Sequence, residues 1–426
     1  MGKALIADNL KVSNSLFAFI LLIPLINAIA TLFTGYFSAG SVNPGTIRAT
    51  ILGVFFIYFL TRHYPVNKPN IFILILLAYF FALVFLSSNP ARSLYIYLRF
   101  FIATMMFPAG YYAINNLNRL RKFYLSLMGV LFILITSIVV SNIFGLGTSD
   151  YLDESFYFGE YGVNITKNMV VLIMLVPVFF IIVQEKKWRY LGFVLFILVM
   201  IFIIVGVKRS ALLALASGII IYLLLSPRKL RSFKIVVIST LFLILISPYF
   251  YPLFLARYEA RQEQVSMGVE ELDEEGRVRE FFAVWDNFKN ANLAEKMMGS
   301  DLFLNRDLWG YGRLRLIHVD YTNLLAGSGL LGLSLFLLMY IAIFNEAKRY
   351  YKLSGKPIIA KELFAVLCAL FAAHAFLSIG GTITGIDLRG LILINLGAIT
   401  GTLKSMARER WKKDSESISE DITTSG

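Results

Sequence analysis

Twelve apolar stretches, separated by short polar or basic segments, constrain the fold of this chain more than any other feature of its sequence. A helix that crosses a bilayer needs about 20 mostly apolar residues, and each stretch is close to that length. We expect membrane-spanning helices at residues 14–37, 47–61, 70–87, 93–114, 124–146, 168–183, 190–206, 210–225, 233–254, 321–344, 362–381 and 386–403. The sequence therefore predicts an all-α, polytopic integral membrane protein of about 12 transmembrane helices.

The amino-acid composition excludes the soluble classes of protein. Hydrophobic residues make up 58% of the 426 residues and charged residues only 16%, whereas soluble chains average about 45–50% apolar and about 25% charged residues. The single cysteine, Cys368, allows no internal disulfide. No small-residue cleavage site follows the first stretch, so we expect a retained anchor and not a removed signal peptide.

Basic residues mark one side of the predicted membrane. The chain carries 40 Lys and Arg residues and a net charge of +13. With the N-terminus in the cytoplasm, the inner segments hold 24 of the 40, within residues 3–11, 62–68, 119–122, 186–189, 228–234, 348–361 and 404–413. An excess of Lys and Arg is typical of cytoplasmic segments. We therefore expect both termini in the cytoplasm, and the net charge requires no nucleic-acid partner.

The longest polar segment, residues 255–320, falls on the external side between the ninth and tenth spans. It carries 13 acidic and nine basic residues, and residues 276–285 have the apolar spacing of a helix. The chain then divides into residues 1–189 (spans one to six), 190–254 (spans seven to nine), 255–320 (external loop domain), 321–403 (spans ten to twelve) and 404–426. We expect the last of these, which is polar, to be a disordered cytoplasmic tail.

Several cations lie near the external ends of predicted spans, against the charge asymmetry. They are Arg48, Arg92, Arg99, Lys208, Arg209 and Arg389. A long basic side chain at a helix end reaches water by itself, so each residue alone requires no function. Together they indicate an anionic ligand at the outer surface, because arginine matches phosphate through paired donors.

The sharpest of these features is the external turn Val207-Lys208-Arg209-Ser210. Arg209 opens the span that follows the turn. A helix N-terminus offers free amide donors and a positive dipole end, and both favour phosphate. The alternative is that the two charges only keep a turn in water.

Of the three histidines, one is placed for proton transfer. His63 falls in a cytoplasmic loop, and His374 lies in the outer half of a span, where we expect it to be packed and hydrogen-bonded. His318 stands at the outer surface just before the span 321–344. Histidine is the side chain best suited to accept a proton near neutral pH. A structural role is the alternative for a lone interfacial histidine.

Metal ligands and cofactor motifs are sparse. The acidic run 270–275 lacks the alternation of a calcium loop and is typical of a solvated helix face. The sequence contains no Cys/His metal set, Walker loop or serine-hydrolase elbow. We therefore expect neither a metal ion nor a cofactor.

Two motifs resemble those of the O-antigen ligase and O-antigen polymerase superfamily of bacterial membrane glycosyltransferases. The first, an arginine followed after three residues by a leucine, fits the segment that begins at Arg209. The second is a histidine, then Asn, Ser or Gln, then nine residues, then two glycines separated by two residues. His318, Gly329 and Gly332 fit this spacing, whereas Val319 departs from the expected polar residue.

The resemblance covers about residues 190–345, where Gly276-Arg277 with downstream Trp285 also looks like the loop arginine of the family. It implies a lipid-sugar (GT-C-like) glycosyltransferase fold and a donor glycan on undecaprenyl diphosphate at the periplasmic face of the bacterial inner membrane. It further implies metal-independent, inverting transfer, with His318 as the catalytic base and Arg209 and Arg277 at the diphosphate. We add Lys208, Arg92 and Arg99 as diphosphate ligands, and Arg48, Asp320, Arg279, His374 and Arg389 as accessory residues.

The sequence thus predicts an enzyme that transfers a lipid-linked glycan onto an acceptor glycan. The departure at Val319 favours a polymerase, whose acceptor is another lipid-linked repeat unit, over a ligase, whose acceptor is the lipid A core. A lipid-linked glycan flippase or another secondary transporter is the alternative from a different class. Against it, charges at mid-membrane depth are few and no matched broken helices are apparent. A structural membrane partner is a third alternative.

Overall fold

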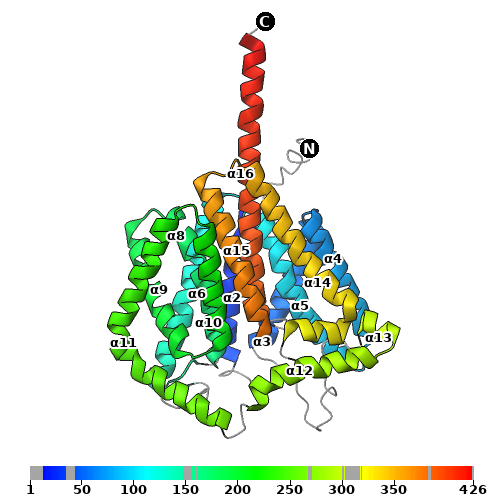
Figure 1. Cartoon of the computed structure of the whole chain (residues 1–426). Helices are drawn as coiled ribbons and strands as arrows, with labels where there is room; N and C mark the ends of the chain where they lie inside the picture. The colour runs from blue at the N-terminus through cyan, green and yellow to red at the C-terminus, as the bar shows by residue number, and fades with distance from the viewer. Residues whose placement is uncertain are drawn as a thin grey trace.

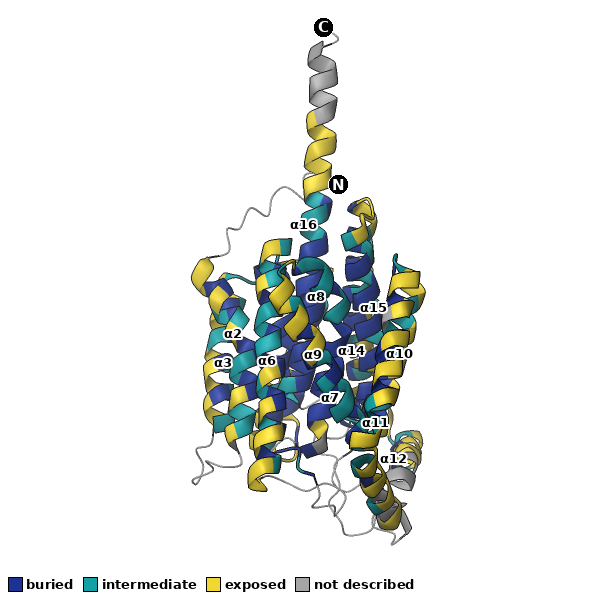
Figure 2. Cartoon of the chain, turned by 90° about the vertical axis from the view of Figure 1, so that its left-hand side faces the viewer, coloured by how far each residue is buried: buried dark blue, intermediate teal, exposed yellow. Residues whose placement is uncertain are grey.

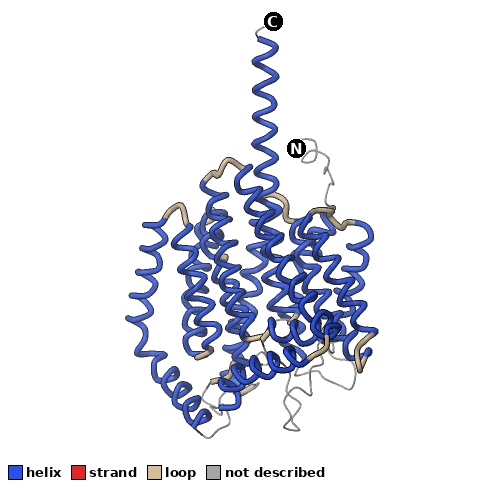
Figure 3. Tube along the Cα trace, turned by 45° about the vertical axis from the view of Figure 1, so that its right-hand side comes forward, coloured by secondary structure: helices blue, strands red, loops and turns tan. Residues whose placement is uncertain are grey.

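The computed structural model describes residues 13–34, 44–146, 156–159, 162–266, 271–299, 302, 317, 319–381 and 385–424. At residues 163, 235, 261, 264–266, 271–279 and 417–424 it describes the backbone alone. The described residues form helices, and no sheet occurs among them (Figure 3). The helices are α2 (Asn14–Thr34), α3 (Pro44–Arg62), α4 (Lys68–Phe85), α5 (Pro90–Ala113), α6 (Leu117–Phe144), α7 (Ile165–Met174), α8 (Val176–Ile182), α9 (Lys186–Val205), α10 (Arg209–Leu225), α11 (Lys229–Ser266), α12 (Glu271–Asn290), α13 (Leu293–Met298), α14 (Asp320–Leu353), α15 (Ile358–Ile379) and α16 (Ile386–Thr424).

The apolar helices form one antiparallel bundle (Figure 1). Among the described residues, 10 helices are long and apolar enough to cross a membrane, or 11 crossings if α7 and α8 form one bent span. The remaining apolar helix, α10, has only 17 residues. The prediction of an all-helical, multi-pass membrane protein is therefore confirmed. The predicted count of about 12 is supported only to 10 or 11 candidate spans.

The two ends of the bundle differ. Helices α12 and α13 lie against one end, called here the α12 end, and the C-terminal part of α16 extends from the opposite one, the α16 end (Figure 1). Because successive helices alternate in direction, α6, α9, α11 and α15 begin at the α16 end and α10, α14 and α16 begin at the α12 end. The basic segments 62–68, 119–122, 186–189, 228–234 and 348–361 therefore all gather at the α16 end.

Asparagine caps explain where three consecutive helices begin. The side chains of Asn67, Asn89 and Asn116 each accept a hydrogen bond from the backbone amide three residues later, at the starts of α4, α5 and α6. Asparagine is among the best N-cap residues because its side chain satisfies a free amide of the first turn. At the other end of α6, Gly145 adopts a left-handed conformation with φ of 63°, which glycine tolerates best.

The break between α7 and α8 has a local cause. Pro177 lies in the first turn of α8, and the two helices meet at 43°. Proline cannot donate a backbone hydrogen bond and its ring excludes a straight continuation of the preceding turn. The span predicted at 168–183 is consequently two short helices.

The centre of the bundle is the pair α5 and α16. Of the apolar window of α16, 94% is buried, against 12% for α11, which lies at the edge (Figure 2). A β-carbon at Gly397 would clash with the Phe107 carbonyl oxygen, and one at Gly110 with that of Ile394. These glycines therefore allow the two backbones to touch, as small residues do in membrane helix pairs.

Two boundaries differ from the sequence prediction. Helix α11 continues beyond the predicted span to Ser266, and α16 continues as helix to Thr424 where a disordered tail was expected. The tail carries ion pairs at helical spacing, such as Arg410 Nε with Asp414 Oδ2 at 3.6 Å. Pairs four residues apart stabilise an isolated helix, which composition alone does not reveal.

Candidate functional site

Most of the buried charged side chains among the described residues lie toward the α12 end of the bundle, whereas Glu346 and Glu362 lie toward the other end. Those at the α12 end come from the first turns of α14 and α16, from α3 and α7, and from the C-terminal part of α15. Ionisable groups among membrane helices are costly and usually mark a functional site. The α12 end of the bundle is therefore the candidate site.

Arg389 and Asp320 form an ion pair that is closed to solvent. Arg389 Nη2 donates to Asp320 Oδ2 at 3.1 Å, and both side chains are 0% exposed. The rings of Phe100 and Phe336 flank the guanidinium, with centroids 5.2 and 5.0 Å from its carbon. Aromatic faces attract a cation, so charge and rings together fix the start of α14 against α16.

A second ion pair lies two residues earlier on α16. Arg48 Nη1 donates to Asp387 Oδ1 at 2.6 Å and to Thr31 Oγ1 at 2.7 Å. Thr31 Oγ1 lies 3.0 Å from Asp387 Oδ2. Asp387 and Arg389 are two residues apart, so the first turn of α16 joins α2 and α3 to α14.

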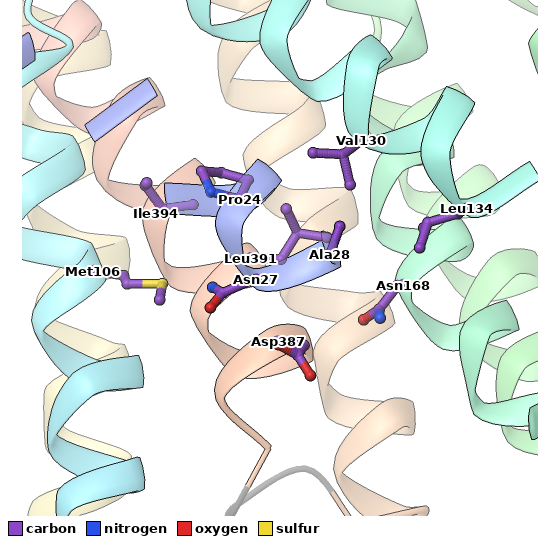
Figure 4. A pocket seen from close by; sticks show the side chains of 10 residues that line it. All are labelled: Pro24, Asn27, Ala28, Met106, Val130, Leu134, Asn168, Asp387, Leu391 and Ile394. Carbon is purple, nitrogen blue, oxygen red and sulfur yellow. The ribbon is translucent and has the colours of Figure 1, made fainter. Parts of the chain in front are cut away.

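A cavity of about 350 Å³ opens beside Asp387 (Figure 4). Asn27 of α2 and Asn168 of α7 line it from opposite sides, and the rest of the lining is apolar. The Oδ1 atoms of both asparagines are buried without a hydrogen-bond partner among the described residues. Buried polar atoms of this kind are usually satisfied by water or a polar ligand.

Lys167 connects this cavity to the start of α10. Its side chain is buried, and Nζ donates to the Gly380 carbonyl oxygen at 2.7 Å at the end of α15. A β-carbon at Gly380 would lie 2.9 Å from Lys167 Nζ and 3.0 Å from Ser210 Oγ. Ser210 follows Arg209 directly, so Lys167, Gly380 and the α10 start form one cluster.

The predicted external turn has an uncommon backbone. Val207 is buried with φ of 48°, a left-handed conformation that β-branched residues rarely adopt and that costs on the order of 1–3 kcal/mol. Lys208 is half-buried and Arg209 is exposed at the first position of α10. Because strained backbone persists at functional sites, this turn is the strongest local sign of function.

His318 itself lies outside the described residues, but the chain is held on both sides of it. The amide N–H of Val319 donates to Glu280 Oε1 at 3.0 Å, and Thr322 Oγ1 donates to the same oxygen at 3.2 Å. Before it, the Ile317 carbonyl oxygen accepts from Asn323 Nδ2 at 3.1 Å. Glu280 belongs to α12 and is fully buried, so α12 fixes the start of α14 beside position 318.

Other predicted residues are placed apart from these clusters. Arg92 lies in the first turn of α5, and Arg99 stacks over the Tyr95 ring at 5.8 Å; both are half-buried. His374 is buried in α15 with its ring 4.9 Å from that of Tyr340. Arg277 and Arg279 lie in α12, and their side chains fall outside the described residues.

Sequence reasoning missed three of the residues that build the site. Lys167 was not among the candidate residues, and Glu280 belongs to the polar segment 255–320, which contains 13 acidic residues. The third, Arg257, is fully buried; its Nη1 donates to the Phe156 carbonyl oxygen at 3.0 Å and its guanidinium lies 5.0 Å from the Phe158 ring. For Arg257 the available signal was a charged residue just after the apolar stretch 233–254, whereas Lys167 lies between the polar Thr166 and Asn168.

Within the described part of the chain, no three His, Cys, Asp or Glu side chains are grouped to hold a metal ion. No protein-family model matches the sequence. A search of curated proteins likewise finds no match. Fold and geometry together show a polytopic, all-helical membrane protein with a buried charged site toward one end of its bundle.

Proposed function

We propose that this protein is a membrane glycosyltransferase of the O-antigen ligase and polymerase type, with its active site at the α12 end. It transfers a glycan from undecaprenyl diphosphate to an acceptor sugar hydroxyl. On this proposal, the α12 end faces the periplasm and the basic α16 end faces the cytoplasm, in agreement with the usual excess of Lys and Arg on the inner side.

The observation that carries the proposal is the fixation of the chain on both sides of position 318. Glu280 binds the Val319 amide, Asn323 binds the Ile317 carbonyl, and Asp320 pairs with Arg389. A catalytic base must be held in a defined place by the structure around it. The family resemblance assigns the base to His318. The contacts made by its neighbours Ile317, Val319 and Asp320 support this assignment, because they fix the chain around position 318.

The proposed step is a direct displacement at the anomeric carbon of the donor. The acceptor hydroxyl oxygen forms a bond to that carbon while the bond from the carbon to the diphosphate oxygen breaks. The hydroxyl proton passes to His318, and undecaprenyl diphosphate leaves with the electron pair. Diphosphate is already a good leaving group, so cations that stabilise its charge replace a general acid.

Arg209 is the cation best placed for the diphosphate. It is exposed at the start of α10, beside the strained Val207 and the buried Lys167 cluster. Arg277 precedes Glu280 by three residues in α12, which is about one helical turn. It is therefore the second ligand of the proposal, carried by the helix that holds the Val319 amide.

A reconstituted assay tests the assignment. Purified protein in detergent receives a labelled lipid-linked glycan, and new glycosidic bonds are measured by gel or mass spectrometry. We expect His318→Ala and Arg209→Ala to lose product by about 100-fold or more, because general bases contribute about 10²–10⁴-fold. The matched controls, His63→Ala and the exposed Arg62→Ala at the α16 end, keep wild-type turnover.

The outcomes separate the alternatives. Wild-type turnover by both site variants would reject the assigned roles. Movement of the labelled lipid across vesicles without bond formation would favour the flippase alternative. Deletion of the gene in its host then separates the acceptors: single repeat units on the core indicate a polymerase, whereas polymer left on the lipid carrier indicates a ligase.

A further inference from the structure

A second cavity lies toward the α16 end, away from the candidate site. It is an open cavity between α7, α8, α9, α10, α11 and α15, with about 870 Å³ of space when the solvent at its mouth is included. Most of its lining is apolar, including Met174, Phe180, Phe193, Phe196, Ile219 and Val236. A cavity of this size and character suits an apolar chain.

One end of this cavity is charged. Arg228 and Arg231 line it at the start of α11, and Glu362 of α15 lies with them. The Glu362 carboxylate is buried and accepts hydrogen bonds from Tyr222 Oη at 2.9 Å and from Ser226 Oγ at 3.4 Å. Arg231 is exposed and Arg228 is half-buried. Two cations and one carboxylate leave a net single positive charge there.

Two walls of the cavity have an apolar outer surface. Helices α9 and α11 carry exposed apolar side chains, among them Val194, Val237 and Leu241. The charged end sits at the basic α16 end, at the level where α11 begins. An amphiphile entering from the bilayer would therefore place its headgroup at the arginines and its tail among the apolar residues.

We propose that this cavity binds one anionic diacyl phospholipid. One acyl chain fills the apolar part, and the headgroup phosphate accepts hydrogen bonds from Arg228 and Arg231. Charge selects the lipid class: one phosphodiester balances the net single positive charge. A zwitterionic headgroup would bring an ammonium group beside the arginines, which repel it. The Glu362 carboxylate, which would attract the ammonium group, already accepts hydrogen bonds from two hydroxyls.

The test measures bound phosphatidylglycerol on the purified, full-length protein by native mass spectrometry. We expect Arg228→Gln/Arg231→Gln to lose phosphatidylglycerol binding by about tenfold or more, because it removes both charged hydrogen-bond donors to the phosphate. The matched control is Lys229→Gln/Lys234→Gln, which removes two exposed charges from the same helix that do not line the cavity. It keeps wild-type binding.

A second variant tests the apolar part independently. Val236→Trp fills the cavity and leaves both arginines in place, so we expect it to lose the lipid while retaining its helical circular dichroism. Equal retention of phosphatidylglycerol by the double arginine variant, or equal binding of phosphatidylcholine by the wild type, would overturn the proposal. So would an equal thermal stabilisation by inorganic phosphate alone, because that result indicates a free-phosphate site.

Discussion

Each of two buried arginines at the α12 end pairs with an aspartate from a distant part of the chain. Arg48 meets Asp387, 339 residues away, and Arg389 meets Asp320, 69 residues away. A lone charge among membrane helices is costly, and pairing offsets this cost only when the geometry is good. The two pairs therefore act as fixed points that set the depths of α3, α14 and α16 relative to one another.

The buried pair makes a prediction about stability. Asp320→Ala should destabilise the fold by about 3–5 kcal/mol, because it leaves Arg389 charged and without this carboxylate in an apolar site. Asp320→Ala/Arg389→Met should be less destabilised than the sum of its single variants, since the uncompensated charge is gone. Thermal unfolding in detergent, followed by fluorescence, measures both effects.

The exposed pair Arg410 and Asp414 supplies the control. Surface ion pairs contribute about 0–1 kcal/mol, so Arg410→Ala should change the melting temperature little. If Asp320→Ala unfolds no earlier than Arg410→Ala, the Arg389 pair is not a structural fixed point. Additive effects in the double variant would lead to the same conclusion.

At the scale of residues, the sequence indicates which positions carry unusual charges but not which residues pair with them. Arg48 and Arg389 were chosen because external cations near span ends run against the charge asymmetry, and Asp320 was added as an accessory residue; all three side chains are buried. Which residue pairs with which depends on the rotation and depth of helices far apart in sequence. Glu280 was missed for the same reason. Its role depends on the hydrogen bond from the Val319 amide, which only the packing of α12 against α14 makes possible.

At the scale of elements, glycines join α13 to α14. Gly329 breaks the helical conformation inside α14 with φ of 63° and ψ of −168°. A β-carbon there would clash with the Met297 backbone and lie 2.6 Å from the Gly299 amide nitrogen. Tyr79 Oη donates to the Ser328 carbonyl oxygen at 2.9 Å, so α4 holds the same kink.

Substitution of this glycine tests the contact. Gly329→Ala should destabilise the protein by about 2 kcal/mol or more, because a left-handed alanine costs about 1–2 kcal/mol before any clash. The control is Gly53→Ala in α3, where a β-carbon meets nothing within 4 Å and alanine favours the helix. Equal melting temperatures for the two variants would show that α13 does not depend on the glycine contact.

In the sequence, Gly329 and Gly332 stand out by their spacing from His318, and neither the packing partner nor the kink is indicated. The period of apolar residues identifies helices and their lengths, because lipid requires about 20 apolar residues in each crossing. This period carries no information on a single residue inside a helix, such as Gly329, whose own backbone is not helical. The split of α7 from α8 was likewise missed, although Pro177 was the available signal.

At the scale of the whole molecule, the 10 or 11 candidate spans and the shorter apolar helix α10 alternate in direction between the two ends of the bundle (Figure 1). Helix α10, although only 17 residues long, is needed for this alternation, because α9 and α11 both begin at the α16 end. Charge then distinguishes the two ends, with the basic segments at one and α12 at the other. These features were predictable from sequence, since both depend on composition along the chain and not on packing.

Thiol labelling tests this orientation directly. In a Cys368→Ala background, single cysteines are placed at the exposed Lys289→Cys in α12 and the exposed Ser415→Cys in α16. An impermeant maleimide added to intact spheroplasts should modify the first position, and the second only after permeabilisation. The reason is that the two residues lie at opposite ends of the bundle, and that on our proposal the basic end faces the cytoplasm. Modification of both positions in intact spheroplasts would contradict the three crossings, α14, α15 and α16, that lead from one position to the other. The reverse pattern would agree with the fold but place the proposed active site in the cytoplasm. It would therefore reject the proposed periplasmic transfer.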